Sequence, residues 1–140
     1  MKREEIGLIQ ESLEYILPKT LEVGRRLYDH LFALDPEIRS LFRTDMETQS
    51  RKLMSILVHI CSNLDRMDQL EPELRELALK HDAYRVRATH YDLLGQALLQ
   101  TLGEACDNRW TPPLQQAWTK AYQLVAESMI RSQRNGKKTG

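Results

Sequence analysis

The sequence predicts a single all-α domain, and three observations carry this prediction. Apolar side chains recur at steps of three and four residues along most of the chain, which places them on one face of successive helices. Leu, Glu, Gln, Arg and Ala are abundant, whereas aromatic residues make up only 6%, a balance that favours helix over strand. Asp35-Pro36 and Thr111-Pro112 each place proline directly after a capping residue, where helices begin. We expect about six to eight helices around one core.

Four helices are expected in the first half of the chain. Pro18 closes the first helix, and Thr20 is expected to cap the second. Asp35-Pro36 opens a short third helix, and a polar connection over residues 43–47 leads to a longer fourth. The inward-facing residues of these helices are, in order, Ile6, Ile9, Leu13 and Ile16; Val23, Leu27, Tyr28, Leu31 and Phe32; Ile38, Leu41 and Phe42; and Gln49, Leu53, Leu57, Ile60 and Leu64.

Three further helices are expected in the second half. Glu71-Pro72 opens the first of them, which frays between Tyr84 and Val86. Thr89 is expected to cap the next helix, and the second cap-and-proline pair opens the last one. Their inward-facing residues are Leu74, Leu77, Ala78 and His81; Tyr91, Leu94, Leu98, Leu102 and Ala105; and Leu114, Trp118, Ala121, Tyr122, Val125 and Met129.

The last ten residues differ in character from the rest. Residues 131–140 are polar and basic and carry no apolar stripe, so we expect a disordered tail after a compact domain over residues 1–130. Asn135-Gly136, a pair typical of hairpin turns, lies in this tail and not between alternating segments. No β signal therefore competes with the helical prediction.

Composition excludes several classes of function. Twenty Lys and Arg residues balance twenty Asp and Glu residues, which argues against a general nucleic-acid or anionic-membrane binder. The longest strongly apolar stretch, residues 55–61, is too short to cross a bilayer and contains a histidine, and the N-terminus has no signal-peptide core. Cys61 and Cys106 match no zinc spacing and no disulfide framework. We expect both to be buried in a protein of the reducing cytoplasm.

Three polar residues occupy inward-facing positions. His81 is either a core histidine satisfied by a neighbour or a metal or haem ligand. The Tyr28 hydroxyl either bonds a backbone carbonyl or faces a pocket, and Gln49 either points to water at a helix start or faces the same pocket. Together the three describe a pocket with one ligating imidazole and two polar groups. Its wall would be formed by Phe32, Phe42, Leu53, Leu57, Leu77 and Leu98.

A glycine in the second helix suggests a close helix crossing. Gly24 costs about 1 kcal/mol relative to alanine in a helix interior. Either it is merely tolerated at the surface, or another helix approaches it closely. Ser50, next to Gln49, is the small residue that such a crossing requires on the partner helix.

These residues occur in an order that resembles the globin family, in particular single-domain bacterial haemoglobins and the haem domain of flavohaemoglobins. The similarity spans residues 4–129, and no block is decisive alone. The matching blocks are Leu27-Tyr28-Asp29-His30-Leu31-Phe32, Asp35-Pro36-Glu37-Ile38, Leu41-Phe42, Gln49-Ser50-Arg51-Lys52-Leu53, Leu79-Lys80-His81, His90-Tyr91-Asp92-Leu93-Leu94-Gly95 and Ala117-Trp118-Thr119-Lys120-Ala121-Tyr122.

The resemblance implies a globin fold that encloses haem b, iron protoporphyrin IX, and implies a role for each site residue. His81 would be the proximal iron ligand, and Phe42 would wedge against the porphyrin. Tyr28 and Gln49 would be the distal polar pair that acts on the diatomic ligand, with Leu53 above the iron. Further residues on the pocket wall would be Leu57, Leu77, Tyr91 and Leu98.

The same resemblance implies reversible binding of dioxygen, nitric oxide and other diatomic ligands, and dioxygenation of nitric oxide to nitrate. Two departures weaken the enzymatic interpretation. The reductase domains of the flavohaemoglobins are absent, so turnover would need a separate NAD(P)H-dependent reductase. The glutamate of the family's last helix aligns with Gln133, although Glu127 is nearby. Two alternatives stay open: an oxygen storage, delivery or gas-sensing globin without turnover, and a haem-free helical interaction module.

Overall fold

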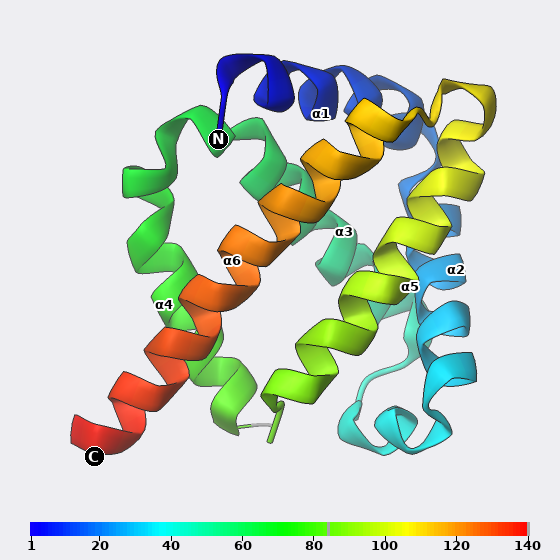
Figure 1. The fold of residues 1–140 in the computed structure, drawn as a ribbon. Helices are drawn as coiled ribbons and strands as arrows, with labels where there is room; N and C mark the ends of the chain where they lie inside the picture. Colours follow the sequence, from blue (N-terminus) through cyan, green and yellow to red (C-terminus); the bar gives the residue numbers. More distant parts are fainter. Residues whose placement is uncertain (84, 140) are drawn as a thin grey trace.

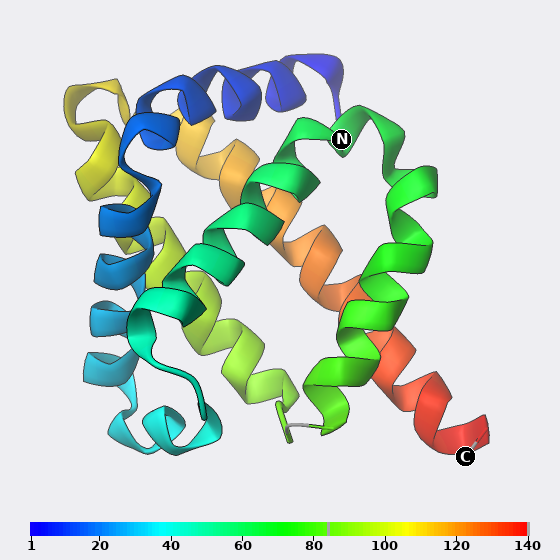
Figure 2. The same cartoon turned by 180° about the vertical axis from the view of Figure 1, so that it is seen from behind.

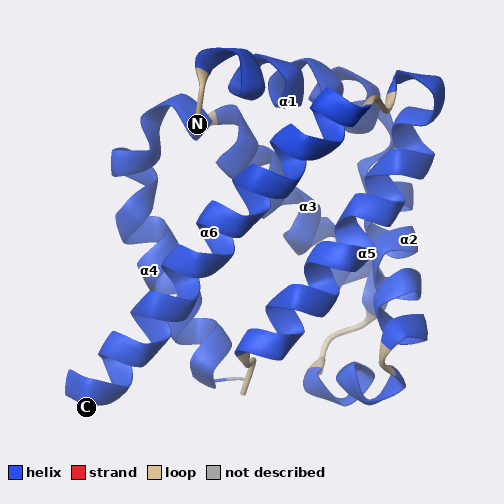
Figure 3. Cartoon of the chain, viewed as in Figure 1, coloured by secondary structure: helices blue, strands red, loops and turns tan. Residues whose placement is uncertain are grey.

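The computed structural model describes residues 1–83 and 85–139, and every regular element among them is helical (Figures 1 and 3). The all-α prediction is confirmed. Short 3-10 turns connect several of the α-helices. The α-helices of the described residues are α1 (Arg3–Ile16), α2 (Thr20–Leu34), α3 (Met46–Ser62), α4 (Met67–Ala83), α5 (Ala88–Cys106) and α6 (Pro112–Thr139), and the 3-10 turns are η1 (Leu17–Lys19), η2 (Pro36–Leu41), η3 (Leu64–Arg66) and η4 (Asp107–Arg109).

The helices cross one another around a shared core. Helix α2 packs against both α3 and α5, α4 packs against α6, and α1 lies across one end of the assembly (Figures 1 and 2). Trp118 on α6 is only 1% exposed and donates its indole N–H to the hydroxyl of Ser12 on α1 at 3.0 Å. Beyond the η3 turn, α3 and α4 diverge (Figure 2). The main core, to which Trp118 belongs, is shared by α1, α2, α3, α5 and α6, and the α3 and α4 backbones lie close together only near this turn.

Two composition-based expectations can be compared with the structure. None of the described helices combines the length and the apolar composition that crossing a bilayer requires. Cys61 and Cys106 are both free and buried, as expected. Burial raises the pKa of the Cys61 thiol to about 12, so this group is uncharged at neutral pH.

Most helix starts are close to the predicted ones, with small shifts. The Asp35 carboxylate accepts the Glu37 N–H at 3.1 Å, and the Thr111 hydroxyl accepts the Leu114 N–H at 3.4 Å, so both cap-and-proline pairs are confirmed. Thr20 is the first residue of α2 and not its cap, and α5 begins before Thr89. The predicted fourth helix ends earlier than expected, since its last inward-facing residue, Leu64, lies in the η3 turn.

Helix α4 begins earlier than Glu71-Pro72, and this prediction was wrong. The helix starts at Met67 and includes Pro72, at a cost of about 3 kcal/mol for an interior proline. Burial offsets this cost, because Leu70 and Leu74, on either side of the proline, are each only 2% exposed. At the other end, Tyr84, where we expected fraying, lies outside the described residues.

The last helix also extends further than the sequence predicted. Instead of a disordered tail from residue 131, α6 continues as helix to Thr139, while Gly140 lies outside the described residues. Gln133 is only 7% exposed, and its side-chain amide donates to the Val86 carbonyl at 3.0 Å. A tertiary contact therefore holds a segment that has no apolar periodicity of its own.

The predicted close crossing lies between α2 and α3. A Cβ atom added to Gly24 would lie 3.0 Å from Met54 Cγ and 3.0 Å from both the Cβ and the carbonyl oxygen of Ser50. Ser50 is fully buried at this contact. Gly24 is thus present because the α3 backbone passes directly over it.

We expect Gly24→Ala to lower the free energy of unfolding by about 1–2 kcal/mol, because overpacking outweighs the gain in helix propensity. Gly7→Ala is the matched control. Gly7 is an exposed helical glycine with nothing within 4 Å of its added Cβ, so the same change should stabilise by about 0.5–1 kcal/mol. Urea unfolding of the two variants measures both values, and equal shifts would contradict the close crossing.

Candidate functional site

His81 lies in the last turn of α4 with its side chain half-buried. Its Nδ1 lies 2.7 Å from the Leu77 carbonyl oxygen. Because a carbonyl can only accept, the proton of the neutral ring must reside on Nδ1, and Nε2 keeps its lone pair. No residue in the described part of the chain bonds to Nε2. This is the arrangement in which a backbone carbonyl orients a metal-ligating imidazole.

The turn after His81 is anchored to α6. The Val86 N–H donates to the His81 carbonyl at 3.0 Å, and Arg85 adopts a left-handed conformation with φ of 66°. The Val86 carbonyl in turn accepts the Gln133 amide. Gln133 therefore fixes the corner that follows His81, a role that the sequence did not reveal because one polar residue in a polar segment carries no pattern.

Tyr91 on α5 lies close to His81. The ring centroids are 6.2 Å apart, and Tyr91 is 5% exposed. Its buried hydroxyl has no hydrogen-bond partner among the described residues; Gln133, which we aligned with the family glutamate, bonds Val86 instead. Burial, together with the nearby Asp82 carboxylate, raises the pKa of Tyr91 to about 12. An unsatisfied buried hydroxyl costs about 1–3 kcal/mol, so Tyr91 lowers the stability of the fold at this position.

Tyr28 and Gln49 meet between α2 and α3. The Gln49 side-chain amide donates to the Tyr28 hydroxyl at 3.3 Å, and the Thr44 hydroxyl donates to Gln49 Oε1 at 2.8 Å. Tyr28 is 4% exposed, and burial raises the pKa of its hydroxyl, which therefore stays protonated at neutral pH. The structure excludes one alternative for each residue: the Tyr28 hydroxyl contacts Gln49 and not a backbone carbonyl, and Gln49 is half-buried with its amide turned to Tyr28 and not to water.

Two aromatic rings pack against the ring of Tyr28. Tyr28 contacts Phe42 edge to face, with ring centroids 5.2 Å apart, and stacks on Phe32 at 5.8 Å. Phe42 follows the η2 turn and also contacts Phe32 edge to face at 5.9 Å. These contacts hold the phenol ring in place, and among the described residues Gln49 is the polar partner of its hydroxyl.

The remaining predicted wall residues divide between two cores. Leu53 and Leu57 on α3 are half-buried and pack against the main core, which also contains Leu98 at 3% exposure. Leu77 on α4 is half-buried and packs against a separate cluster between α4 and α6. Leu53 and Leu57 therefore lie on α3 and Leu77 lies on α4, while Leu98 lies in the core on α5.

A cavity of about 300 Å³ lies between α3 and α4, and we call it the α3–α4 cleft. Ile56 and Ile60 line it from α3, and Leu77 lines it from α4. Ile56, a large apolar residue of this wall, is 37% exposed. At its rim, His59 Nε2 donates to Glu73 Oε2 at 2.6 Å. His59 thus contacts Glu73 and takes no part in the Tyr28–Gln49 pair.

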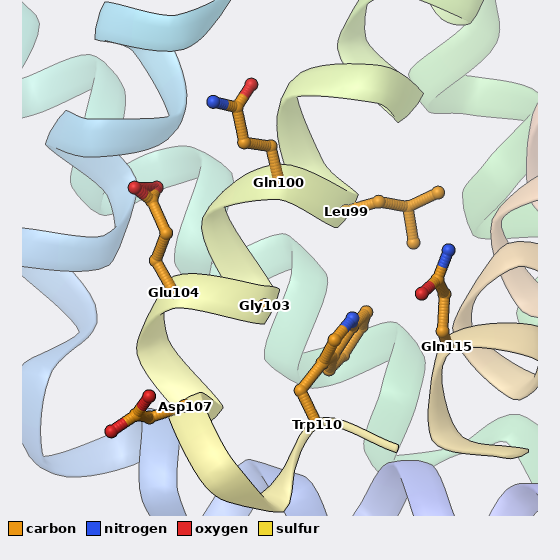
Figure 4. A pocket seen from close by; sticks show the side chains of 7 residues that line it. All are labelled: Leu99, Gln100, Gly103, Glu104, Asp107, Trp110 and Gln115. Atoms are coloured by element: carbon orange, nitrogen blue, oxygen red, sulfur yellow. The ribbon is translucent and has the colours of Figure 1, made fainter. Parts of the chain in front are cut away.

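A second surface cavity, of about 430 Å³, lies at the C-terminal end of α5 (Figure 4). Leu99, Trp110 and Gln115 gather on one side of it, while the Glu104 carboxylate is turned away. Glu104 accepts the His30 Nε2 proton at 2.5 Å. This cavity includes none of the predicted site residues. No cluster of three His, Cys, Asp or Glu side chains among the described residues could hold a bare metal ion.

The sequence model of the globin family matches residues 25–129. The flavohaemoprotein of Vibrio cholerae is 26% identical over 133 residues, which cover 93% of this chain and 34% of that protein. The chain spans about a third of the length of the flavohaemoproteins it matches. An uncharacterised globin-like protein of Aquifex aeolicus is 26% identical, with 93% of this chain and 92% of that protein covered.

A solved structure has the same fold. It is a candidate nitric oxide dioxygenase from Rhodothermus marinus, engineered as a carbene transferase. It superposes with a TM-score of 0.90 at 26% identity, covering 99% of this chain and 97% of the other. The family match extends from α2 to α6 and includes Tyr28, Gln49 and His81. The chain belongs to the globin family.

Proposed function

We propose that this globin holds haem b through the Nε2 atom of His81 and reversibly binds dioxygen and other diatomic ligands opposite that histidine. The observation that carries the proposal is the Nε2 lone pair of His81, which bonds no described residue, on a ring oriented by the carbonyl of Leu77, a residue that lines the α3–α4 cleft. Half-buried Leu53, Leu57 and Leu77 would contact the apolar faces of the porphyrin. The residues present therefore fit the group that membership of the family implies.

The distal side offers proton donors to a ligand. Because Tyr28 accepts from Gln49, its own O–H remains available to donate. Tyr28 is only 4% exposed and its ring packs on Phe32 and Phe42, and this burial would strengthen the interaction of its hydroxyl with a ligand that carries partial negative charge. The pair would therefore slow the release of dioxygen.

We further propose that the protein converts nitric oxide and dioxygen to nitrate. When bound, haem supplies the iron centre for this reaction and the one electron it consumes, which a separate NAD(P)H-dependent reductase would restore. Support comes from the Rhodothermus marinus relative, named as a candidate nitric oxide dioxygenase, and from the flavohaemoproteins. The chain has no net charge to steer a reductase, so docking would depend on a local patch. The free, buried cysteines favour a cytoplasmic location.

Rapid mixing of the haem-loaded, dioxygen-saturated protein with nitric oxide tests this activity. We expect one nitrate per protein in a single turnover, and sustained nitrate production once a reductase and NADH are added. A yield well below one nitrate per protein molecule would contradict dioxygenation. The remaining functions would then be dioxygen storage, dioxygen delivery or gas sensing. A purified protein that develops no Soret band after haem addition would instead support a haem-free interaction module.

A further inference from the structure

Thr44 makes the contact that orders Gln49. Its hydroxyl donates to Gln49 Oε1 at 2.8 Å, and Gln49 Nε2 then faces Tyr28. Thr44 is half-buried in the connection between η2 and α3 and belongs to neither helix. Through Gln49, three side chains from α2, α3 and this connection form one hydrogen-bonded chain that ends at the Tyr28 hydroxyl.

The position of Thr44 follows from how α3 begins. Asp45 caps the helix, since its carboxylate accepts both the N–H and the hydroxyl of Thr48, at 2.9 and 2.8 Å. Thr44 is therefore the residue before the cap, and Gln49 is the fourth residue of the helix. Side chains at these two positions regularly meet, usually as an apolar pair that fixes the entry of the chain. Here a hydrogen bond takes the place of the apolar contact.

The orientation of the Gln49 amide decides what Tyr28 can do. With Thr44 donating to Oε1, the NH₂ group faces Tyr28, so the phenol oxygen accepts and its proton is free for a ligand. With the amide reversed, Tyr28 would donate to Oε1 and its proton would be used. Without Thr44, Oε1 would lose its partner, and the amide could rotate to either orientation or toward water.

We propose that Thr44 is a positioning residue that sets the dioxygen dissociation rate by holding the Gln49 amide on Tyr28. It acts through Gln49 and does not itself touch the ligand. This inference rests on the proposed function, because the rate it controls exists only if the protein binds haem and dioxygen.

Two substitutions separate the effect of the Thr44 hydroxyl from the effect of the shape of its side chain. Thr44→Val keeps the branched side chain and removes the donor, whereas Thr44→Ser keeps the donor. We expect Thr44→Val to speed dioxygen release by about 2- to 10-fold, the range for one hydrogen bond between neutral groups, and Thr44→Ser to stay nearer to the parent protein. In carbon monoxide complexes of the haem-loaded protein, the C–O stretching frequency should rise for Val and not for Ser. Unchanged release in Thr44→Val, or equal effects of Val and Ser, would overturn the proposal.

A double-mutant cycle tests the route through Gln49. In a Gln49→Leu background, Thr44→Val should have no further effect on dioxygen release. An undiminished effect would show that Thr44 acts elsewhere, and would also overturn the proposal.

The contact itself is measurable without any ligand. We expect the side-chain amide resonances of Gln49 in the full chain to move in Thr44→Val and to stay in Thr44→Ser, whether or not haem is bound. A chain that takes up no haem would contradict the proposed function while these resonances still decide whether Thr44 holds Gln49. Resonances that do not move in Thr44→Val would contradict the inference even if dioxygen binds.

Discussion

His81→Gly is expected to abolish normal haem ligation. The Nε2 atom of His81 carries a lone pair that bonds no described residue, and the carbonyl of Leu77, a residue that lines the α3–α4 cleft, orients the ring. Losing an orienting partner of a metal ligand costs about 10- to 100-fold in affinity, so losing the ligand itself should cost more. Haem titration followed by absorption spectroscopy measures the loss. Added imidazole should restore a histidine-like spectrum, because the glycine leaves room for it.

Two controls separate ligation from other effects. Arg75→Gly places the same glycine penalty of about 1 kcal/mol on an exposed position of α4 and should leave haem binding unchanged. His59→Ala removes another histidine, which is engaged with Glu73 at the rim of the same cleft. If His59→Ala lowered haem affinity as much as His81→Gly, the assignment of His81 as the ligand would be wrong.

The helices that the sequence predicted best are those with unbroken apolar stripes. Amphipathic periodicity locates α2, α3 and α5 because it records which face is buried. It fails at Pro72, where local chemistry favours a helix start but the buried Leu70 and Leu74 hold the helix through the proline. It fails again beyond residue 130, where Gln133 secures the helix by one long-range hydrogen bond.

The site was predictable in part, and packing explains which part. Gly24 and Ser50 mark the crossing of α2 and α3. Tyr28 lies one turn after Gly24, and Gln49 precedes Ser50, so the crossing that the small residues permit also brings the distal pair together. Thr44 could not be identified in the same way, because its role depends on the geometry of the α3 cap and not on a repeating pattern.

On the side of His81, aligning residues with the family did not predict the contact that Gln133 makes. The family resemblance aligned Gln133 with a glutamate that pairs with the tyrosine beside the proximal histidine. The structure places Tyr91 beside His81, but the Gln133 amide bonds the Val86 carbonyl and leaves the Tyr91 hydroxyl without a partner in the described part of the chain. A neutral side chain in this place supplies no carboxylate to increase the basicity of His81. In this structure Gln133 instead anchors the turn that follows α4.

Tyr28→Phe is expected to have the largest effect on ligand release. A hydrogen bond to a charged group contributes about 1.5–3 kcal/mol, which corresponds to an increase of about 10- to 150-fold in the dioxygen dissociation rate. The phenylalanine ring keeps the contacts with Phe32 and Phe42, so the fold and haem affinity should change little. Stopped-flow displacement of dioxygen by carbon monoxide measures the rate directly.

Tyr15→Phe is the matched control for this substitution. Tyr15 lies on α1, beneath the Arg109 guanidinium at 3.8 Å, and takes no part in the distal pocket. It should release dioxygen at the parent rate. If Tyr28→Phe also did so, the hydroxyl that Gln49 holds in place would not contact the ligand, and the slow release would have to come from Gln49 alone. The Gln49→Leu variant distinguishes between these two donors. If it increased the dioxygen dissociation rate more than Tyr28→Phe does, the Gln49 amide, and not the Tyr28 phenol, would be the principal donor.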